Sequence, residues 1–227
     1  LTQNRLLTPN IEMAVSRTMD DIEGAYSLVI MTHTKLIAAR DPNGFRPLCI
    51  GELPDGNGWA FASESCALDA VGAKFVRDVQ PGEIVIADHN GLRSIVDHCG
   101  TAPHTMCVFE YIYFARPDSI IEGTCVHEAR LQAGRFLAQE HPVEADVVIG
   151  APDSGLDAQE SGIPYGVGFI KNKYVGRTFI QGSQAQRESS VRIKLNAISS
   201  TVKGKRVVLV DDSIVRGTTS ARTIRLL

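Results

Sequence analysis

Cysteine is scarce in this sequence, and its spacing builds no familiar site. The five cysteines are an odd number, and no two of them stand three positions apart. A disulfide framework usually has an even number of cysteines, and a structural zinc site usually has closely spaced pairs. We therefore expect neither a disulfide scaffold nor a zinc site made of these residues alone.

Blocks of like charge and long hydrophobic runs are also missing. The chain has 23 basic and 26 acidic residues and a formal net charge of −3, without a cluster of either sign. A nucleic-acid surface would show clustered Lys and Arg, and a membrane span needs roughly 20 apolar residues. No secretory signal opens the sequence either. We expect a cytoplasmic protein that binds neither nucleic acid nor a membrane.

The composition is that of an ordinary globular protein. Hydrophobic residues make up 44% and charged residues 22% of the 227 positions, enough for a sizeable core without disulfides. The length lies between one domain and two complete ones. The first residue is Leu1, and residues 221–227 read as a helix that stops in its second turn. We therefore expect a fragment at both ends.

Residues 1–100 have the pattern of a β-rich domain with one leading helix. Ile11, Val15, Met19 and Ile22 recur at helical spacing behind Asn10, which predicts a helix from about residue 11. Turn residues, among them an Asn-Gly pair, separate the strands that follow, and a short helix is expected near residue 67. The expected strands are residues 25–31, 35–39, 59–63, 84–87 and 92–96.

Residues 107–227 alternate helix and strand, which predicts a parallel sheet. A helix is expected at 128–137, strands at 146–150 and 205–210, and an extended segment at 164–169. The second strand is almost wholly apolar, which is typical of a strand covered on both faces. Residues 97–106 are polar and predict a linker. We therefore divide the chain into domains 1–100 and 101–227.

The strongest chemical signal follows the strand that ends at Val210. Two neighbouring acids, Asp211 and Asp212, come next, and a short loop then leads through Gly217 into a helix near Thr218. In open α/β sheets, ligands bind outside the carboxyl ends of the strands, and the start of a helix favours a phosphate. Carboxylates repel phosphate, so they suit hydroxyl groups or a metal ion instead. A sugar phosphate with vicinal hydroxyls suits both the acids, which bind the hydroxyls, and the helix start, which binds the phosphate. The alternative is that the two acids only cap a turn.

Two further segments could serve the same ligand. Ser154 lies in the loop after the strand 146–150 and offers an oxygen ligand to a hard cation. Basic residues gather farther on, among glycines at 166, 168 and 176 that fit a moving segment, and such a cluster suits a pyrophosphate group. The alternative is a solvated basic loop. The basic residues are Lys171, Lys173, Arg177 and Arg187.

Residues 208–219 resemble the phosphoribosylpyrophosphate (PRPP) signature of type I phosphoribosyltransferases, in the form found in glutamine PRPP amidotransferases. Residues 40–48, 109–119 and 171–180 resemble stretches of the same family. The four stretches stand in the family's order, and the likeness covers nearly the whole chain.

The resemblance implies a mixed α/β and α+β protein in two parts. The first is part of a glutaminase domain of the N-terminal-nucleophile (Ntn) hydrolase class, an αββα sandwich. The second is part of a type I phosphoribosyltransferase domain, a parallel sheet with flanking helices. The implied reaction, the first step of purine biosynthesis, converts PRPP, glutamine and water to 5-phosphoribosylamine, glutamate and pyrophosphate. The implied partners are PRPP, glutamine and inhibitory purine nucleotides, within a homotetramer.

The resemblance also assigns roles to individual residues. Ser154, Asp211 and Asp212 match positions that hold Mg²⁺, and the four basic residues match a flap that closes over PRPP. Cys107 stands where some family members place one ligand of a [4Fe–4S] cluster, with the other three expected beyond Leu227. The PRPP loop itself is matched by Asp211, Asp212, Ser213, Ile214, Val215, Arg216, Gly217, Thr218 and Thr219.

The sequence departs from the family pattern in its first half and after Ser154. The family's glutaminase uses an N-terminal Cys whose own amino group acts as the base, and residue 1 here is Leu. The pocket segments His-Arg-Tyr and Ser-Asp-Ser-Glu and the Asn-Gly of the oxyanion site are absent too, since Asn90-Gly91 is read as a hairpin turn, so these residues should not hydrolyse glutamine. The stretch near Ala158 is shorter than usual for the family. Three alternatives stay open: a phosphoribosyltransferase for another base, a non-catalytic PRPP sensor, and a degenerate structural domain.

Overall fold

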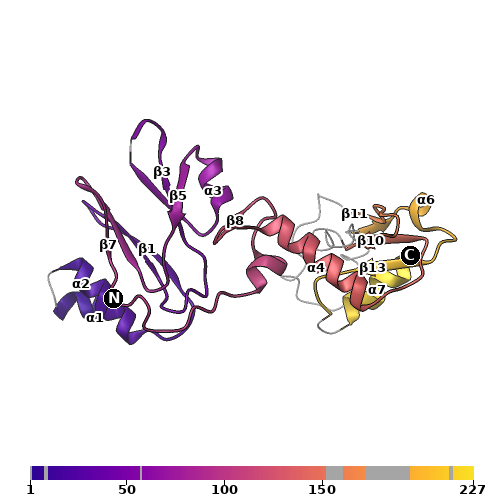
Figure 1. Cartoon of the computed structure of the whole chain (residues 1–227), viewed down its shortest axis with the longest axis horizontal. Helices are drawn as coiled ribbons and strands as arrows, with labels where there is room; N and C mark the ends of the chain where they lie inside the picture. The colour runs from indigo at the N-terminus through magenta and orange to yellow at the C-terminus, as the bar shows by residue number, and fades with distance from the viewer. Residues whose placement is uncertain (1, 8–9, 57, 152–160, 172–194, 215–216) are drawn as a thin grey trace, which may run out of the picture. The chain divides into compact units, whose positions relative to one another are not determined.

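The structure is a computed structural model, and it describes residues 2–7, 10–56, 58–151, 161–171, 195–214 and 217–227. It forms two compact units, Leu1–His127 and Glu128–Leu227. Figure 1 traces the chain through both units. Each unit is described by itself below.

The first unit opens with two helices and a four-stranded antiparallel sheet. Helix α1 spans Thr2–Leu7 and α2 spans Ile11–Asp21, and the Asn10 side chain caps α2 by accepting a hydrogen bond from the Glu12 amide. The sheet has the order β1-β2-β6-β7. Its strands are Ser27–Met31 (β1), Leu36–Arg40 (β2), Ile84–Asp88 (β6) and Gly91–Ile95 (β7).

A second antiparallel sheet has the order β4-β3-β5. Its strands are Cys49–Glu52 (β3), Trp59–Ala62 (β4) and Lys74–Asp78 (β5). The short helix η1, Pro54–Gly56, joins the first two strands, and helix α3, Ser65–Ala70, follows β4.

The alternation of side chains along the strands stacks these elements into four layers. On β2, Ile37 and Ala39 pack with Val15 and Met19 of α2, while Ala38 faces a second cluster. That second cluster joins the two sheets through Leu48, Ile50, Val79 and Val85. The neighbouring Cys49 points the other way, to a cluster with Leu68 of α3. The order α2, sheet, sheet, α3 is the expected αββα sandwich, and the helices lie outside their sheets in Figure 1.

Residues 101–127 also belong to the first unit. They include one π-helical turn, η2 (Glu110–Phe114), a tight hairpin of β8 (Ile120–Ile121) and β9 (Thr124–Cys125), and the first two residues of helix α4 (Val126–Glu140). Ala115, Ile121 and Val126 form a small buried cluster. Residues 97–106, expected to be a linker, are bound to this unit, for example by the Thr105 amide, which donates to Asn43 O at 2.8 Å. The domain boundary near residue 100 stays a prediction.

The second unit contains a parallel strand pair and an antiparallel one. Strand β10 (Val147–Gly150) pairs in parallel with β13 (Val207–Val210), and β11 (Phe169–Lys171) pairs with β12 (Leu195–Ala197). Helices α6 (Ser199–Val202) and α7 (Thr218–Leu226) flank β13 in sequence. Arg206 fixes the start of the parallel pair, since its guanidinium binds the Asp146 carboxylate at 2.9 Å.

Two sequence expectations change in the second unit. Strand β13 is half-buried along its length rather than covered on both faces. Gly166 and Gly168 were expected to permit movement, but a Cβ on Gly168 would lie 2.4 Å from Ile149, and one on Gly166 would lie 2.8 Å from Thr201. These glycines permit close packing instead.

Most other expected elements are confirmed, including the β6–β7 hairpin at Asn90–Gly91 and the turn at Pro81–Gly82, where Gly82 has φ +80°. The sequence reading missed α1, β3, β5, η2, the β8–β9 hairpin, β12 and α6. None of the helices in the described ranges combines the length and hydrophobicity that a bilayer crossing demands.

Candidate functional site

The carboxyl edge of the parallel pair brings two predicted site segments together. Gly150 pairs with Val210, and the Ala151 amide donates to Val210 O at 2.8 Å. The loop that leads to Ser154 therefore starts beside Asp211, at the carboxyl edge where ligands of open α/β sheets bind. Ser154 itself lies outside the described residues.

The two acids of the loop point toward solvent, not into the core. Asp211 is exposed and Asp212 is half-buried, and the Asp212 amide donates to Asp211 Oδ1 at 3.0 Å. Partial desolvation and the neighbouring Asp212 carboxyl raise the pKa of Asp211. Two carboxylates that crowd each other favour a ligand that brings positive charge or donates hydrogen bonds.

The loop then reaches the start of a nine-residue helix. Gly217 precedes α7 with φ +69°, a left-handed conformation that favours glycine. Gly217 has no side chain to cap the first amides of α7, and helix N-termini of this kind bind phosphate groups. Ser213 and Ile214 are exposed between the acids and the helix. The loop therefore offers two carboxylate side chains and, a few residues later, the backbone amides at the start of a helix.

Several predicted site residues cannot be placed. Lys171 ends strand β11, where its backbone pairs with Leu195, and nothing is described of its side chain. The side chains of Thr218 and Thr219 are likewise not described, although both residues begin α7. The predicted residues that lie wholly outside the described ranges are Ser154, Lys173, Arg177, Arg187, Val215 and Arg216. The short stretch near Ala158 lies outside them too.

Of the two predicted cofactors, Mg²⁺ has candidate carboxylate ligands in this chain, and the iron–sulfur cluster stays a prediction because three of its four ligands are expected beyond Leu227. Asp211 and Asp212 offer adjacent carboxylate oxygens, the ligand type that Mg²⁺ prefers. A [4Fe–4S] cluster needs four thiolate ligands. All five cysteines are described, and within the described ranges no three His, Cys, Asp or Glu side chains gather as a metal site. Cys107 donates its amide to Phe45 O at 3.1 Å, which is a structural contact.

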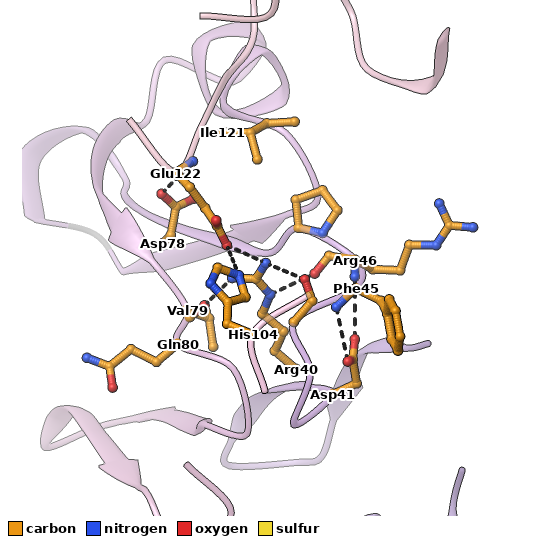
Figure 2. Close-up of polar contacts among 12 residues, drawn as sticks. Arg40, Asp41, Phe45, Arg46, Asp78, Val79, Gln80, His104, Ile121 and Glu122 are labelled. Carbon is orange, nitrogen blue, oxygen red and sulfur yellow. Dashed lines mark hydrogen bonds and ion pairs between the residues drawn. The ribbon is translucent and has the colours of Figure 1, made fainter. Parts of the chain in front are cut away.

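Two of the stretches that resemble the family bind each other in the first unit, which the sequence reading did not predict. Arg46 donates to the buried Glu110 carboxylate at 2.7 Å, and its guanidinium lies 5.0 Å from the Phe114 ring centre. Arg40 binds Glu122 of the β8–β9 hairpin at 2.8 Å. Figure 2 shows the Glu122 carboxylate between Arg40 and His104. The only sequence signal near this contact was an Arg beside a turn-rich loop, in a stretch that resembles the family.

Comparison with known proteins first gives the class. Residues 5–70 match a family model described as a glutamine amidotransferase domain. This match lies within the αββα unit.

Comparison with whole proteins then gives the family. The chain is 50% identical over 219 residues to the amidophosphoribosyltransferase of Archaeoglobus fulgidus, which covers 94% of the chain and 47% of that protein. It is 52% identical over 218 residues to the amidophosphoribosyltransferase of Bacillus subtilis, with 94% and 45% covered. The chain thus belongs to the amidophosphoribosyltransferase family, and it spans about half the length of the curated relatives it matches.

A solved structure agrees with this assignment. The glutamine PRPP amidotransferase of B. subtilis, complexed with ADP and GMP, superposes with a TM-score of 0.86 at 50% identity and covers 96% of this chain and 48% of that one. The nucleotides belong to that complex.

Proposed function

We propose that the second unit binds Mg-PRPP at residues 211–219, as part of an amidophosphoribosyltransferase. This enzyme is a pentosyltransferase that replaces the pyrophosphate of PRPP with ammonia from glutamine, the first step of purine biosynthesis. Family membership at about 50% identity supports the reaction. The family's homotetramer, its inhibition by purine nucleotides and a cytoplasmic location stay predictions.

One observation carries the site. The parallel register of β10 and β13 puts Asp211 and Asp212 at the carboxyl edge of the sheet, directly before the Gly217 turn into α7. A ribose 5-phosphate has hydroxyls and a phosphate at opposite ends, and the loop offers carboxylates and helix amides in the same order. Neither half alone would select this ligand.

Each group of residues is proposed to bind a different part of PRPP. The amides at the start of α7 receive the 5′-phosphate, with Ser213 and the side chains of Thr218 and Thr219 as further donors. The carboxylates of Asp211 and Asp212 receive the ribose hydroxyls, as hydrogen-bond acceptors. Lys171, Lys173, Arg177 and Arg187 are proposed to bind the pyrophosphate that leaves. Since ammonia arrives uncharged, no base in this unit has to deprotonate it.

The same acids are the proposed Mg²⁺ ligands, together with Ser154. Mg²⁺ keeps several waters and binds through one or two carboxylates plus substrate phosphates, which fits two adjacent Asp residues on an exposed edge. Bound there, Mg²⁺ neutralises the charge of the pyrophosphate group. The side chains orient the ribose and hold it at the sheet edge.

Isothermal titration with PRPP, with and without Mg²⁺, tests the binding site. We expect Mg²⁺-dependent binding by the native chain and a loss of about 100-fold or more in the Asp211→Asn/Asp212→Asn variant, because two charged contacts are lost. Glu144→Gln is the matched control, since it removes a carboxylate on the exposed surface of the same unit. Equal affinity of the native chain and the double variant would refute the site.

Catalysis needs a second test, because PRPP binding alone fits a sensor as well as an enzyme. The longer protein that contains these residues is incubated with Mg-PRPP and ammonia, and pyrophosphate release is measured. Release that requires ammonia supports the amidotransferase. Release that requires adenine or orotate would indicate another phosphoribosyltransferase, and tight binding without release a sensor.

A further inference from the structure

The stretch 40–48 is not absorbed by the proposed PRPP site, yet it is among the most buried parts of the chain. Arg40 and Asp41 are almost completely inaccessible to solvent. Asp41 accepts hydrogen bonds from the amides of Tyr26, Phe45 and Arg46, so it closes its own loop. Buried charges persist when their hydrogen-bonding capacity is satisfied. Asp41 therefore shapes the loop, and the Arg40 side chain extends from the loop to another segment of the first unit.

Arg40 joins this loop to the β8–β9 hairpin. Its guanidinium donates to three backbone oxygens, of Arg46, Val79 and Gly44, at 2.7 to 2.9 Å. The remaining contact, at 2.8 Å, is to Glu122 Oε1. Because the backbone contacts hold the guanidinium in place, Arg40 offers Glu122 a rigid and desolvated partner.

Glu122 is tied at three points. Its Oε1 atom meets Arg40 and also His104 Nε2 at 3.0 Å, and its amide donates to Asp78 Oδ2 at 3.2 Å. Burial raises the pKa of Asp78. Figure 2 shows the four side chains converging on this turn.

The backbone of Glu122 is in an unfavourable conformation for its residue type. Glu122 has φ +49° and Gly123 has φ +78°, and Ile121 pairs with Thr124 across this two-residue turn. Turns with two positive φ values favour Asn, Asp or Gly at the first position. A Glu there costs conformational energy, so its carboxylate contacts must offset the cost.

The hairpin leads directly into α4. The first two amides of α4 are capped by this segment, since Val126 N donates to Ser119 O at 3.0 Å and His127 N donates to Pro117 O at 2.9 Å. Val126 is fully buried beside Ile121. The hairpin therefore fixes where α4 begins.

We propose that Glu122 is a positioning residue: held by Arg40 and His104, it fixes the β8–β9 hairpin and the start of α4. We call the contact of Glu122 with Arg40 and His104 the latch. The stretch 40–48 is its fixed part, and the β8–β9 hairpin is the part that it holds in place.

Substitutions of Glu122 separate the latch from an ordinary turn. Asn tolerates positive φ better than Glu, so Glu122→Asn would tighten an ordinary turn, but it would loosen a latch that depends on the carboxylate. Glu122→Gln keeps the length and removes the charge. Asp118→Asn is the matched control, because it makes the same chemical change in the same segment at an exposed ion pair.

Hydrogen exchange read by mass spectrometry or NMR is the primary measurement. We expect Glu122→Asn and Glu122→Gln to speed exchange at Glu122, Val126 and His127 about tenfold or more, and to speed it along α4, while Asp118→Asn leaves it unchanged. Slower exchange in Glu122→Asn, or unchanged exchange in Glu122→Gln, overturns the latch.

Discussion

The two units use charged residues in opposite ways. In the first unit, the stretch 40–48 turns its charges inward, where Arg40 and Asp41 are buried and satisfied by backbone groups. In the second unit, Asp211 and Asp212 face solvent and, within the described residues, meet each other rather than a basic side chain. Charges of the first kind complete the fold, whereas charges of the second kind are the ones that the proposed PRPP site uses. Resemblance to a family signature does not distinguish the two, because both stretches resemble the same family.

The comparison predicts the largest stability loss at Arg40. Arg40→Met keeps the bulk but leaves Glu122 and three backbone oxygens without their donor. We expect the first unit to lose about 3–5 kcal/mol. Urea denaturation followed by the fluorescence of Trp59, the only tryptophan, measures this unit alone. Arg116→Ala, at an exposed arginine, should change the stability far less than Arg40→Met does. Equal stability losses in Arg40→Met and Arg116→Ala would show that the burial of Arg40 does not determine its contribution to stability.

A pair of glycines tests close packing in the first unit. Gly82 and Gly100 both have positive φ, but a Cβ on Gly82 would lie 2.2 Å from His98 O, whereas nothing lies within 4 Å of one on Gly100. Gly82→Ala should therefore cost about 1–3 kcal/mol more than Gly100→Ala. The same fluorescence assay gives both values, and equal costs would mean that the 98–99 backbone moves freely away.

Glu12 allows a test by pH. Hydrogen bonds from Arg93 and Lys35 outweigh desolvation and lower the pKa of Glu12 to about 2. A lowered carboxyl pKa gives stability that is present above the ordinary value near 4.5 and is lost as pH falls through about 2. We expect Glu12→Gln to cost about 1–2 kcal/mol at pH 7. The difference from the native chain should shrink between pH 4.5 and pH 2, and a constant difference would contradict the ionic origin.

The smallest stability effect is expected at Asp211. Its pKa is raised, so ionisation in the folded state costs free energy, and stability is lost as pH rises through the folded pKa. Asp211→Asn should therefore leave stability unchanged or raise it by up to about 0.5 kcal/mol at neutral pH, while PRPP binding falls. Thermal unfolding of the native chain and of Asp211→Asn at pH 7 and pH 3.5 compares the ionised and the protonated Asp211 carboxyl. A large loss of stability would place Asp211 with the structural charges of the first unit.

Local patterns predicted much of this fold. The helical spacing of Ile11, Val15 and Met19 marked α2, and the Asn90–Gly91 pair marked the β6–β7 hairpin. The strand before Asp211 and the glycine before α7 also stand where they were expected. In each case the signal lies within a few neighbouring residues, and local geometry is what side-chain periodicity and turn residues encode.

The same local patterns did not predict contacts between residues that are far apart in the sequence. β3 and β5 were missed, and their short stretches gain stability from the sheet they share and not from their own propensity. The contact between Arg40 and Glu122 spans 82 positions, and no spacing rule joins residues that far apart. The packing role of Gly168 was missed for the same reason, because its neighbour is Ile149 of another strand.

The sequence by itself determined the residues of the proposed PRPP site: a pair of acids, a glycine turn and a helix start, in an order that suits a phosphoribosyl group. Only the tertiary structure decided which charges are buried in the fold and which are exposed. Burial depends on what packs around a side chain, and that environment comes from segments far away in the chain. Arg40 and Asp211 look alike as charged residues beside a loop, and their surroundings alone make one a structural anchor and the other a candidate ligand-binding group.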